Sequence, residues 1–319
     1  MVSAKPTAFN VLLSFILLAI IITTGCNHKM KKSSIVSKAI AHYPSASGIE
    51  MVNNEMYMIG DDANHLLIVD SNINIIDSIP LYSFSDKRIP KAVKADLEAM
   101  TVLPDGNILL LGSGSLAPYR NTAWIINPII KSKDSIRLDV FFNRLKSSEI
   151  KEINIEGVAS VENKIILANR GNKSNPNNYL IITENEFWKS QNDSAFHITS
   201  LTGTNGDTNF NGISGIAYSA KSKQLIMTAS TEDTYTTHGD GAIGKSYLWI
   251  INDINTKLYN NILAIDKKIE LDSAFAEIKG HKIESVTILK ENEQEYHLAL
   301  AADDDNGSSH LFKIIIKKV

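Results

Sequence analysis

One short pattern recurs five times along the chain, and it constrains the fold more than any other feature. The five copies read SGIEM (47–51), ADLEAM (95–100), NIEGV (154–158), NGISGI (211–216) and HKIESV (281–286). Each copy is followed by a turn and a second apolar run, then by a polar loop and a third run, and a fourth run precedes the next copy. Short strands, four to a repeat and with no sustained helical period, predict an all-β protein, a β-propeller.

The spacing of the copies predicts the number of blades. The positions we align are Glu50, Glu98, Glu156, Ser214 and Glu284. The last copy leaves room for three strands only, whereas an unassigned strand-like segment, 34–43, precedes the first copy. We therefore expect five blades over residues 35–319, with the N-terminal strand completing the last blade and closing the ring. Six blades are the main alternative, and a β-sandwich or two small β-domains are the other one.

The aligned residues are expected to face the central channel. The first strand of each blade lines the channel, and alternate side chains of a strand point to opposite faces. Four of the aligned residues are glutamates, namely Glu50, Glu98, Glu156 and Glu284. Carboxylates packed together raise one another's pKa unless positive charge or hydrogen-bond donors compensate. A hard divalent cation such as Ca²⁺ or Mg²⁺, an inward-reaching arginine or lysine, or backbone amides and water would each compensate.

Polar loop residues are expected at the same end of the channel. The start of a first strand and the end of a second strand meet at one end of a blade, so the loops after second strands lie beside the glutamates. The candidate ligand-binding residues are Asp61, Asn169, Arg170 and Asp303 in these loops, with Arg120 and Lys245 just before third strands. This acidic ring with a polar and basic rim predicts a ligand or metal site. The alternative is a structural ring, in which each glutamate pairs with neighbouring backbone.

The N-terminus has the pattern of a bacterial export signal. A mostly apolar run, 9–22, ends at Thr23-Thr24-Gly25-Cys26, and it is shorter than the roughly 20 residues of a membrane-spanning helix. A small residue directly before a cysteine resembles a lipobox. Residues 1–26 are thus predicted to be a lipoprotein signal peptide, Cys26 the lipidated residue and 27–34 a tether. We expect a lipid-anchored protein of the cell envelope, at the outer membrane or the periplasmic face. An uncleaved N-terminal anchor is the alternative.

Charge and cysteine content exclude two classes of protein. The formal net charge is −3, which provides no basic footprint for nucleic acid. Cys26 is the sole cysteine, so neither an intramolecular disulfide nor a cysteine-based metal cage can form. The eight histidines show no metal-binding spacing such as H-x-x-x-H. We expect a monomer.

The repeated signature places a glutamate between a hydrophobic and a small residue, as in 97–100 and 155–158. It resembles the inner-strand motif of the phytase-like esterase domains, the SdiA-regulated family and, more distantly, the SMP-30-type lactonases. With its lipobox and its Asn/Ile/Lys-rich composition, the chain is similar to an uncharacterised propeller lipoprotein family of Bacteroidetes. This resemblance covers about residues 35–319. It implies a calcium ion at the channel mouth, held by Glu50, Glu98, Glu156 and Glu284, and Ser214 departs from the motif.

These observations favour two functions. The first is a membrane-tethered binding module that uses its acidic, cation-bearing face to hold a small molecule or an envelope protein. The second is a Ca²⁺-dependent hydrolase of a phosphoester, ester or lactone, in which the metal polarises the substrate or activates water. Arg120, Arg170 or Lys245 would then hold the anion. A purely structural role in envelope assembly is a third alternative.

Overall fold

Apolar runs between polar turns form strands throughout the part of the chain that the structure describes. The computed structural model describes residues 35–84, 86, 88–204, 210–232, 235–236, 243–304 and 307–318, besides Met1. The predicted signal peptide, Cys26 and the tether 27–34 lie outside these described residues. Within them, no helix has both the length and the apolar character to cross a membrane.

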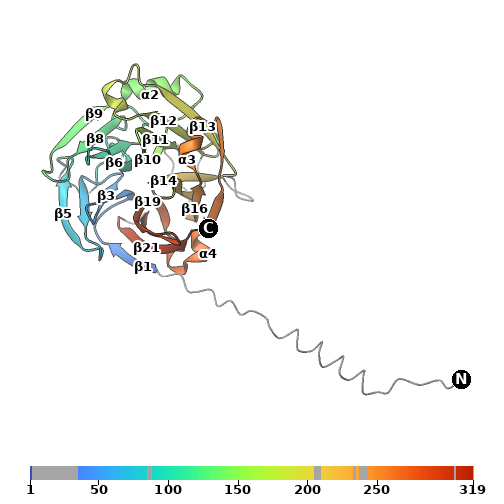
Figure 1. Ribbon diagram of the computed structural model, residues 1–319. Helices are drawn as coiled ribbons and strands as arrows, with labels where there is room; N and C mark the ends of the chain where they lie inside the picture. The colour runs from blue at the N-terminus through green and yellow to red at the C-terminus, as the bar shows by residue number, and fades with distance from the viewer. Residues whose placement is uncertain are drawn as a thin grey trace. The chain divides into compact units, whose positions relative to one another are not determined.

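The strands form five separate sheets, which are the five blades of a propeller (Figure 1). Blade 1 contains β2 (Ala46–Val52), β3 (Glu55–Gly60), β4 (His65–Val69) and β5 (Ile75–Pro80). Blade 2 contains β6 (Leu97–Val102), β7 (Ile108–Gly112), β8 (Thr122–Ile126) and β9 (Lys133–Arg137). Blade 3 contains β10 (Ile155–Val161), β11 (Lys164–Asn169), β12 (Tyr179–Glu184) and β13 (Phe196–Thr202), with β17 (Ile262–Ala264) added parallel to β13. Blade 4 contains β14 (Asn211–Ser219), β15 (Gln224–Glu232), β16 (Ile243–Ile251) and β18 (Lys267–Glu270).

Blade 5 joins the two ends of the described chain. It contains β19 (Lys282–Glu291), β20 (Glu295–Asp303) and β21 (Ser309–Lys317), and its outermost strand is the N-terminal β1 (Ile35–Ile40). β1 pairs antiparallel with β21, from Ile35 opposite Ile314 to Ile40 opposite Ser309. This pairing ties the start of the propeller to its end and covers an otherwise unpaired edge of β21. The predictions of five blades and of closure by the N-terminal strand are confirmed.

The inner strands β2, β6, β10, β14 and β19 surround the channel, and each contacts the next around the ring. Every inner strand has a register shift close to its start, where one residue is left out of the ladder. The five residues at these bulges are Ser47, Glu98, Glu156, Ser214 and Glu284. A bulge re-aims the side chain of its extra residue, so the fold itself singles out one residue per blade.

The core lies between the blades, where the faces of neighbouring sheets pack together. Leu109 and Leu111 of β7, for example, share one buried cluster with Val158 of β10. Short helices occupy the connections between strands: α2 (Asp139–Lys146), η1 (Phe187–Lys189), α3 (Ile254–Lys257), α4 (Leu271–Ala274) and η2 (Ala276–Ile278). Phe141 and Phe142 of α2 are fully buried in the same cluster as Leu109, so this helix completes the packing between blades 2 and 3.

Candidate functional site

The five bulge residues define one end of the channel, which we call the upper mouth. Glu50 is not among them, because the bulge of blade 1 falls at Ser47, between Ala46 and Gly48. Glu50 lies three residues further along β2, which is about 10 Å at the rise of a strand. The predicted equivalence of Glu50 with Glu98, Glu156 and Glu284 is therefore wrong, and the upper mouth contains three bulge glutamates and two serines.

A small residue follows every bulge, and the close approach of the inner strands explains why. These residues are Gly48, Ala99, Gly157, Gly215 and Ser285. A Cβ atom on Gly215 would lie 2.8 Å from the backbone oxygen of Glu284 in the next blade, which is closer than atoms pack. The small residue is thus the signal that identifies Ser47-Gly48, rather than Glu50-Met51, as the first copy of the motif.

Glu98 is a strongly perturbed carboxyl of the upper mouth. Burial raises its pKa well above the ordinary value, and the nearby charges of Asp96, Glu156 and Asp61 raise it further. Lys94 opposes this rise only in part. Among the residues that the structure describes, none donates a hydrogen bond to the Glu98 carboxylate. Glu98 therefore keeps its proton to a higher pH than an exposed glutamate does.

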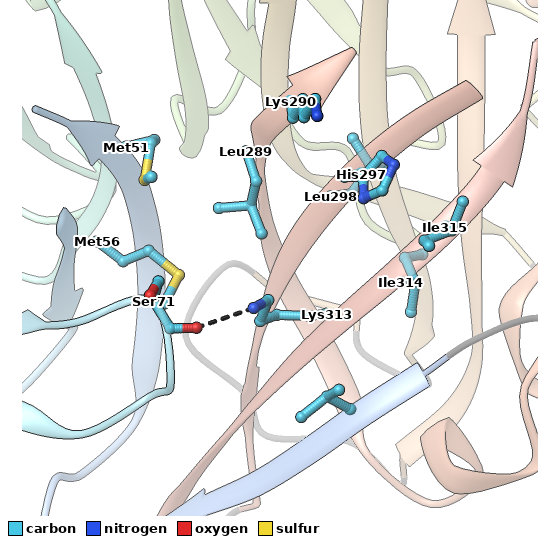
Figure 2. Close-up of a pocket in the computed structure, with 11 residues that line it drawn as sticks. Met51, Met56, Ser71, Leu289, Lys290, His297, Leu298, Lys313, Ile314 and Ile315 are labelled. Carbon is cyan, nitrogen blue, oxygen red and sulfur yellow. Dashed lines mark hydrogen bonds between the residues drawn. The ribbon is translucent and has the colours of Figure 1, made fainter. Parts of the chain in front are cut away.

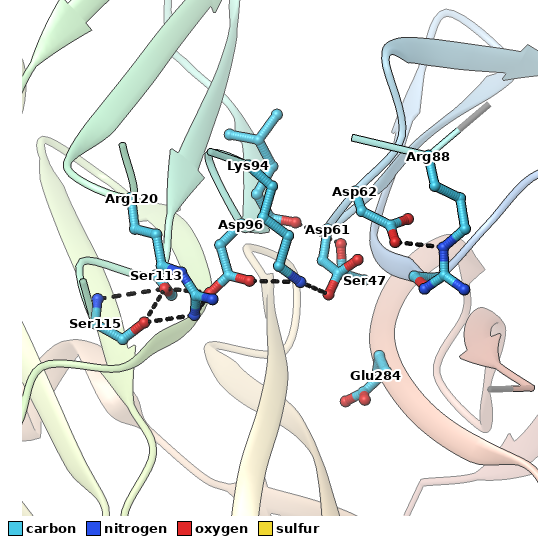
Figure 3. A network of polar contacts seen from close by, with 12 residues as sticks. Ser47, Asp61, Asp62, Arg88, Lys94, Asp96, Ser113, Ser115, Arg120 and Glu284 are labelled. Atoms are coloured by element: carbon cyan, nitrogen blue, oxygen red, sulfur yellow. Dashed lines mark hydrogen bonds and ion pairs between the residues drawn. The ribbon is translucent and has the colours of Figure 1, made fainter. Parts of the chain in front are cut away.

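Lys94 lies between two aspartates that come from neighbouring blades (Figure 3). Its Nζ atom is 2.8 Å from Asp96 Oδ1 and also pairs with Asp61. Burial alone would lower the pKa of Lys94, but the carboxylates of Asp61 and Asp96 outweigh burial and raise it. Burial raises the pKa of Asp61 to about 6, although Lys94 opposes the rise. One carboxyl oxygen from each of Asp61, Asp96 and Glu98 lies within 4.8 Å of the others.

Arg120 holds the other side of Asp96. Its Nη1 atom is 2.6 Å from Asp96 Oδ2 and donates a hydrogen bond of 2.9 Å to Ser115 Oγ. The Ser113 hydroxyl donates to Asp96 Oδ2 at 2.5 Å. Arg120 is only 5% exposed, so its guanidinium fixes the position of Asp96 rather than extending over the mouth as a free anion-binding group.

Arg170 reaches toward two of the bulge glutamates. Its Nη1 atom is 4.0 Å from Oε2 of both Glu156 and Glu284, and its Nη2 atom donates to Ser230 Oγ at 3.2 Å. The side chain lies over Gly212, where a Cβ atom would be 2.4 Å from Arg170 Nε. A glycine at this position therefore leaves the space that the guanidinium occupies.

Glu284 is the most enclosed of the glutamates at the upper mouth, at 6% exposure. Lys282 Nζ lies 2.7 Å from its Oε1 atom, whereas Oε2 is buried and accepts no hydrogen bond from a described residue. Of the three predicted ways to compensate the acidic ring, the described residues use cationic side chains: Lys94, Arg120, Arg170 and Lys282. This compensation leaves the Glu98 carboxyl and one Glu284 oxygen without a donor.

The remaining predicted ligand-binding residues lie elsewhere or serve the scaffold. Asn169 is buried, and its Oδ1 atom accepts the Asn154 backbone N–H at 2.8 Å, which fixes the start of β10. Lys245 is exposed and pairs at 2.9 Å with Glu270, a residue of the outermost strand of blade 4. Asp303 is the last residue of β20. Its charge raises the pKa of Arg88, but the hydrogen bond from Arg88 to Asp62 raises that pKa more.

Glu50 belongs to the opposite end of the channel, which we call the lower mouth. A cavity of about 250 Å³ is lined there by Glu50, Thr101, Ala159, Ala217 and Thr287, among others. Thr287 Oγ1 donates to Glu50 Oε1 at 2.7 Å, and the Met51 backbone N–H donates to the same oxygen at 2.9 Å. Burial raises the pKa of Glu50, and these two hydrogen bonds oppose the rise.

Sequence reasoning missed three residues of the upper mouth: Lys94, Asp96 and Lys282. Lys94, Asp96 and Glu98 alternate along the chain, and Lys282 likewise stands two residues before Glu284. The backbone is left-handed at Asp96 (φ 53°), so strand alternation alone does not bring these side chains together. The available signal was the Lys that stands two or four positions before two of the bulge glutamates.

A second, apolar cavity of about 310 Å³ lies between blades 5 and 1 (Figure 2) and shares Met51 with the cavity of the lower mouth. Met51, Met56 and Leu298 form part of its wall, and Lys313 donates a hydrogen bond of 2.8 Å to the backbone oxygen of Ser71 at its edge. Its described lining contains lysines and a histidine but no carboxylate. This cavity therefore lacks the acidic character of the upper mouth.

The fold and the channel define the class of protein: a five-bladed β-propeller with a charged upper mouth. Within that class, the chain belongs to the family described as "Family of unknown function (DUF6929)", which matches residues 42–316. No curated protein matches the chain.

Several solved structures are similar to this chain. The glutaminyl cyclase of Myxococcus xanthus aligns with 90% of this chain and 97% of its own, at 8% identity and a TM-score of 0.52. The virginiamycin B lyase of Staphylococcus aureus aligns with 88% of this chain and 99% of its own, at 10% identity and a TM-score of 0.40. The allergen Mala s 1 of Malassezia sympodialis aligns with 89% and 95%, at 11% identity and a TM-score of 0.46. At 8% identity, the likeness to the cyclase shows the fold alone.

Proposed function

We propose that the protein is a lipid-anchored binding module of the cell envelope, whose upper mouth holds a divalent cation and, through it, a small molecule or a partner protein. One observation carries the proposal: Glu98 is a half-buried channel carboxyl without a hydrogen-bond donor among the described residues, and it lies beside Asp61 and Asp96. A group in that position gains from any positive charge that replaces its proton.

The donor set fits a hard cation. Carboxylate oxygens are the ligands that Ca²⁺ and Mg²⁺ prefer, and those of Asp61, Asp96 and Glu98 already converge. Buried oxygens without a donor, Asp61 Oδ1 and Glu284 Oε2, point to the same need for positive charge. Asp61, Asp96 and Glu98 would hold the ion, and Lys94 would move from between the two aspartates to make room. The ion would supply open coordination positions for an anionic group of the ligand.

Calorimetric titration of the full chain with CaCl₂ and with MgCl₂ tests this site. We expect one bound Ca²⁺ per chain and release of a proton from Glu98, seen as a binding heat that changes with the ionisation enthalpy of the buffer. Glu98→Gln should weaken binding at least tenfold. Glu50→Gln is the matched control, because Glu50 is also a channel glutamate with a raised pKa, and it should bind as the wild type does. Equal binding by the Glu98→Gln chain would show that the ion, if bound, lies elsewhere.

The membrane anchor rests on the sequence 1–34 and has its own test. Cys26→Ser should release the protein from the membrane fraction of cells, and the wild type should carry the mass of an acylated cysteine at its mature N-terminus. A wild-type protein that keeps residues 1–25 and remains in the membrane would support the uncleaved anchor instead.

A hydrolase of a phosphoester, ester or lactone is the second candidate, and the two neighbouring carboxyls favour it. Burial and like charges raise the pKa of Glu98 well above its ordinary value, whereas burial raises that of Asp61 to about 6. Neighbouring carboxyls with raised pKa values can donate and accept a proton near neutral pH. Turnover of such substrates that follows a bell-shaped pH profile and is lost in Glu98→Gln would support catalysis. If the protein binds Ca²⁺ but turns over none of these substrates, the result would support the binding module over the hydrolase.

A further inference from the structure

Three residues far apart in the sequence meet at the end of blade 5. His281 directly precedes β19, Asp304 directly follows β20, and His310 is the second residue of β21. Strand pairing brings them together, because Ile283 lies opposite Ala302 and Ala302 lies opposite His310. The cluster is at the same end of the blade as the bulge at Glu284.

The side chains of this cluster converge on one carboxylate. His281 Nδ1 lies 2.6 Å from Asp304 Oδ1, and His310 Nδ1 contacts Asp304 Oδ2. The two imidazole centroids are 4.4 Å apart. One ligand atom from each of the three residues lies within 4.8 Å of the others. Phe312 packs against both rings, at centroid distances of 5.1 and 5.8 Å, and so restricts their orientation.

The three side chains of the cluster differ in their exposure to solvent. The Asp304 side chain is 7% exposed, whereas the His281 and His310 side chains are 22% and 23% exposed. The carboxylate is therefore held inside, and both imidazoles reach solvent. A metal ion bound here has an entry path and keeps a position for water or a further ligand.

We propose that His281, Asp304 and His310 form a binding site for a transition-metal dication, with Zn²⁺ as the ion that the donor set fits best. Two imidazole nitrogens and one carboxylate oxygen, with a fourth position open to water, form the ligand pattern of exchangeable zinc sites. Imidazole ligands suit Zn²⁺ and other first-row transition metals, whereas oxygen-only sites suit Ca²⁺ and Mg²⁺. The upper mouth and this cluster therefore take different ions, and the second site goes beyond the proposed function.

The alternative arrangement is a hydrogen-bonded triad, in which each neutral imidazole donates from Nδ1 to one oxygen of Asp304. Two imidazoles 4.4 Å apart repel each other when both are protonated. A dication bound to the neutral rings supplies the positive charge that Asp304 needs without placing a charge on each ring. Phe312 supplies an apolar wall, and such a wall strengthens the electrostatic interactions of a bound ion.

Metal analysis of the full chain, stripped with a chelator and then titrated with ZnCl₂, tests the site. We expect one Zn²⁺ per chain at micromolar free ion and a rise in melting temperature on binding. Co²⁺ in place of Zn²⁺ should give the visible absorption of a four-coordinate site with nitrogen ligands. His310→Ala and His281→Ala should each weaken Zn²⁺ binding at least a hundredfold, and Asp304→Asn at least tenfold.

His297→Ala is the matched control. His297 is also partly exposed and lies 2.9 Å from a carboxylate, that of Glu295, so it should leave Zn²⁺ binding unchanged. Glu98→Gln should also leave it unchanged, and His310→Ala should leave Ca²⁺ binding at the upper mouth unchanged, which separates the two proposals. The zinc site is ruled out if the wild type binds no Zn²⁺ at these concentrations, or if the His310→Ala chain binds it as tightly as the wild type.

Discussion

The two mouths of the channel both contain a half-buried glutamate on an inner strand, yet they compensate its charge in different ways. At the lower mouth, Glu50 accepts hydrogen bonds from neutral donors, the Thr287 hydroxyl and the Met51 backbone N–H. At the upper mouth, Glu98 has no such donor among the described residues and lies beside Asp61 and Asp96, which are held by Lys94. The carboxylate of the lower mouth is thus compensated by neutral hydrogen-bond donors, whereas the carboxylates of the upper mouth are compensated by positive charge.

This difference teaches how a repeated fold separates structure from chemistry. The bulge lies at the start of every inner strand and aims its residue at the upper mouth. Three of the five bulge residues are glutamates, so repetition of the fold gathers like charges there. The lower mouth, three positions further along the strands, contains Thr101, Ala159, Ala217 and Thr287 and a single carboxylate, that of Glu50. The upper mouth is therefore the end at which ions, protons or charged ligands change the energy most.

The largest effect should come from removing the ammonium group at the upper mouth. Lys94→Met keeps the apolar stem but leaves Asp61 and Asp96 without the cation between them, and breaking such a buried pair costs about 3–5 kcal/mol. We expect a loss of that size in the free energy of unfolding by urea at pH 7. At pH 5 the loss should be smaller, because Asp61, whose pKa burial raises to about 6, is then protonated.

Lys245→Met is the control for that substitution. Lys245 forms an ion pair with Glu270 on the exposed surface of blade 4, where solvent screens the charges and the pair contributes little to stability, so we expect a far smaller loss. If both substitutions cost the same, Lys94 would be an ordinary surface lysine in energetic terms, and the contrast between the two mouths would disappear.

The second substitution should increase the free energy of unfolding, because ionisation of Glu98 destabilises the folded chain. Its folded pKa is raised, so the folded chain binds more protons than the unfolded chain, and stability falls as the pH rises through the folded pKa. Glu98→Gln cannot ionise, and it should be more stable than the wild type at pH 8, because the unfolded wild type releases at that pH a proton that the folded chain holds at a raised pKa. Below the ordinary glutamate pKa the two chains should unfold at the same urea concentration. The measurement is a urea titration at a series of pH values.

Saturating Ca²⁺ sharpens this prediction. If the ion binds Glu98 as proposed, it should stabilise the wild type at pH 8 and leave Glu98→Gln unchanged, so that the difference between them shrinks or reverses. A pH profile that is the same for both chains would mean that Glu98 titrates as an exposed carboxyl does.

The sequence was enough to predict the propeller, its five blades and its closure, because these depend on the repeated alternation of short apolar runs and turns. It was not enough to place Glu50. Glu50 stands three positions after Ser47, and only the bulge decides which of the two occupies the upper mouth. Ser47 occupies the position at which three other blades have a glutamate, so the sequence alone does not reveal that these positions are equivalent. Gly48, the next residue, is the small residue that the close packing of the inner strands requires.

The charged and titratable residues that contact one another were harder to predict, because strand pairing rather than sequence spacing brings them together. Lys94 of blade 2 reaches Asp61 of the loop after β3, 33 positions earlier in the chain. The cluster of His281, Asp304 and His310 likewise follows no spacing rule for metal ligands, since its members stand at the ends of three different strands. Local patterns identify which residues are unusual, whereas the ladder register determines which of them meet.

The smallest effect should come from the lower mouth, and it measures what a neutral donor contributes to a half-buried glutamate. Thr287→Val preserves the shape of a fully buried side chain and removes the hydroxyl that donates to Glu50. A hydrogen bond to a charged group contributes about 1.5–3 kcal/mol, and the Met51 N–H remains, so we expect a loss near 1–2 kcal/mol at pH 7. In the Glu50→Gln background the loss should fall below 1 kcal/mol, because the acceptor is then uncharged. A double-mutant cycle by urea unfolding gives the coupling energy directly. A coupling near zero would mean that water satisfies Glu50 as well as Thr287 does, and that the lower mouth owes its stability to packing alone.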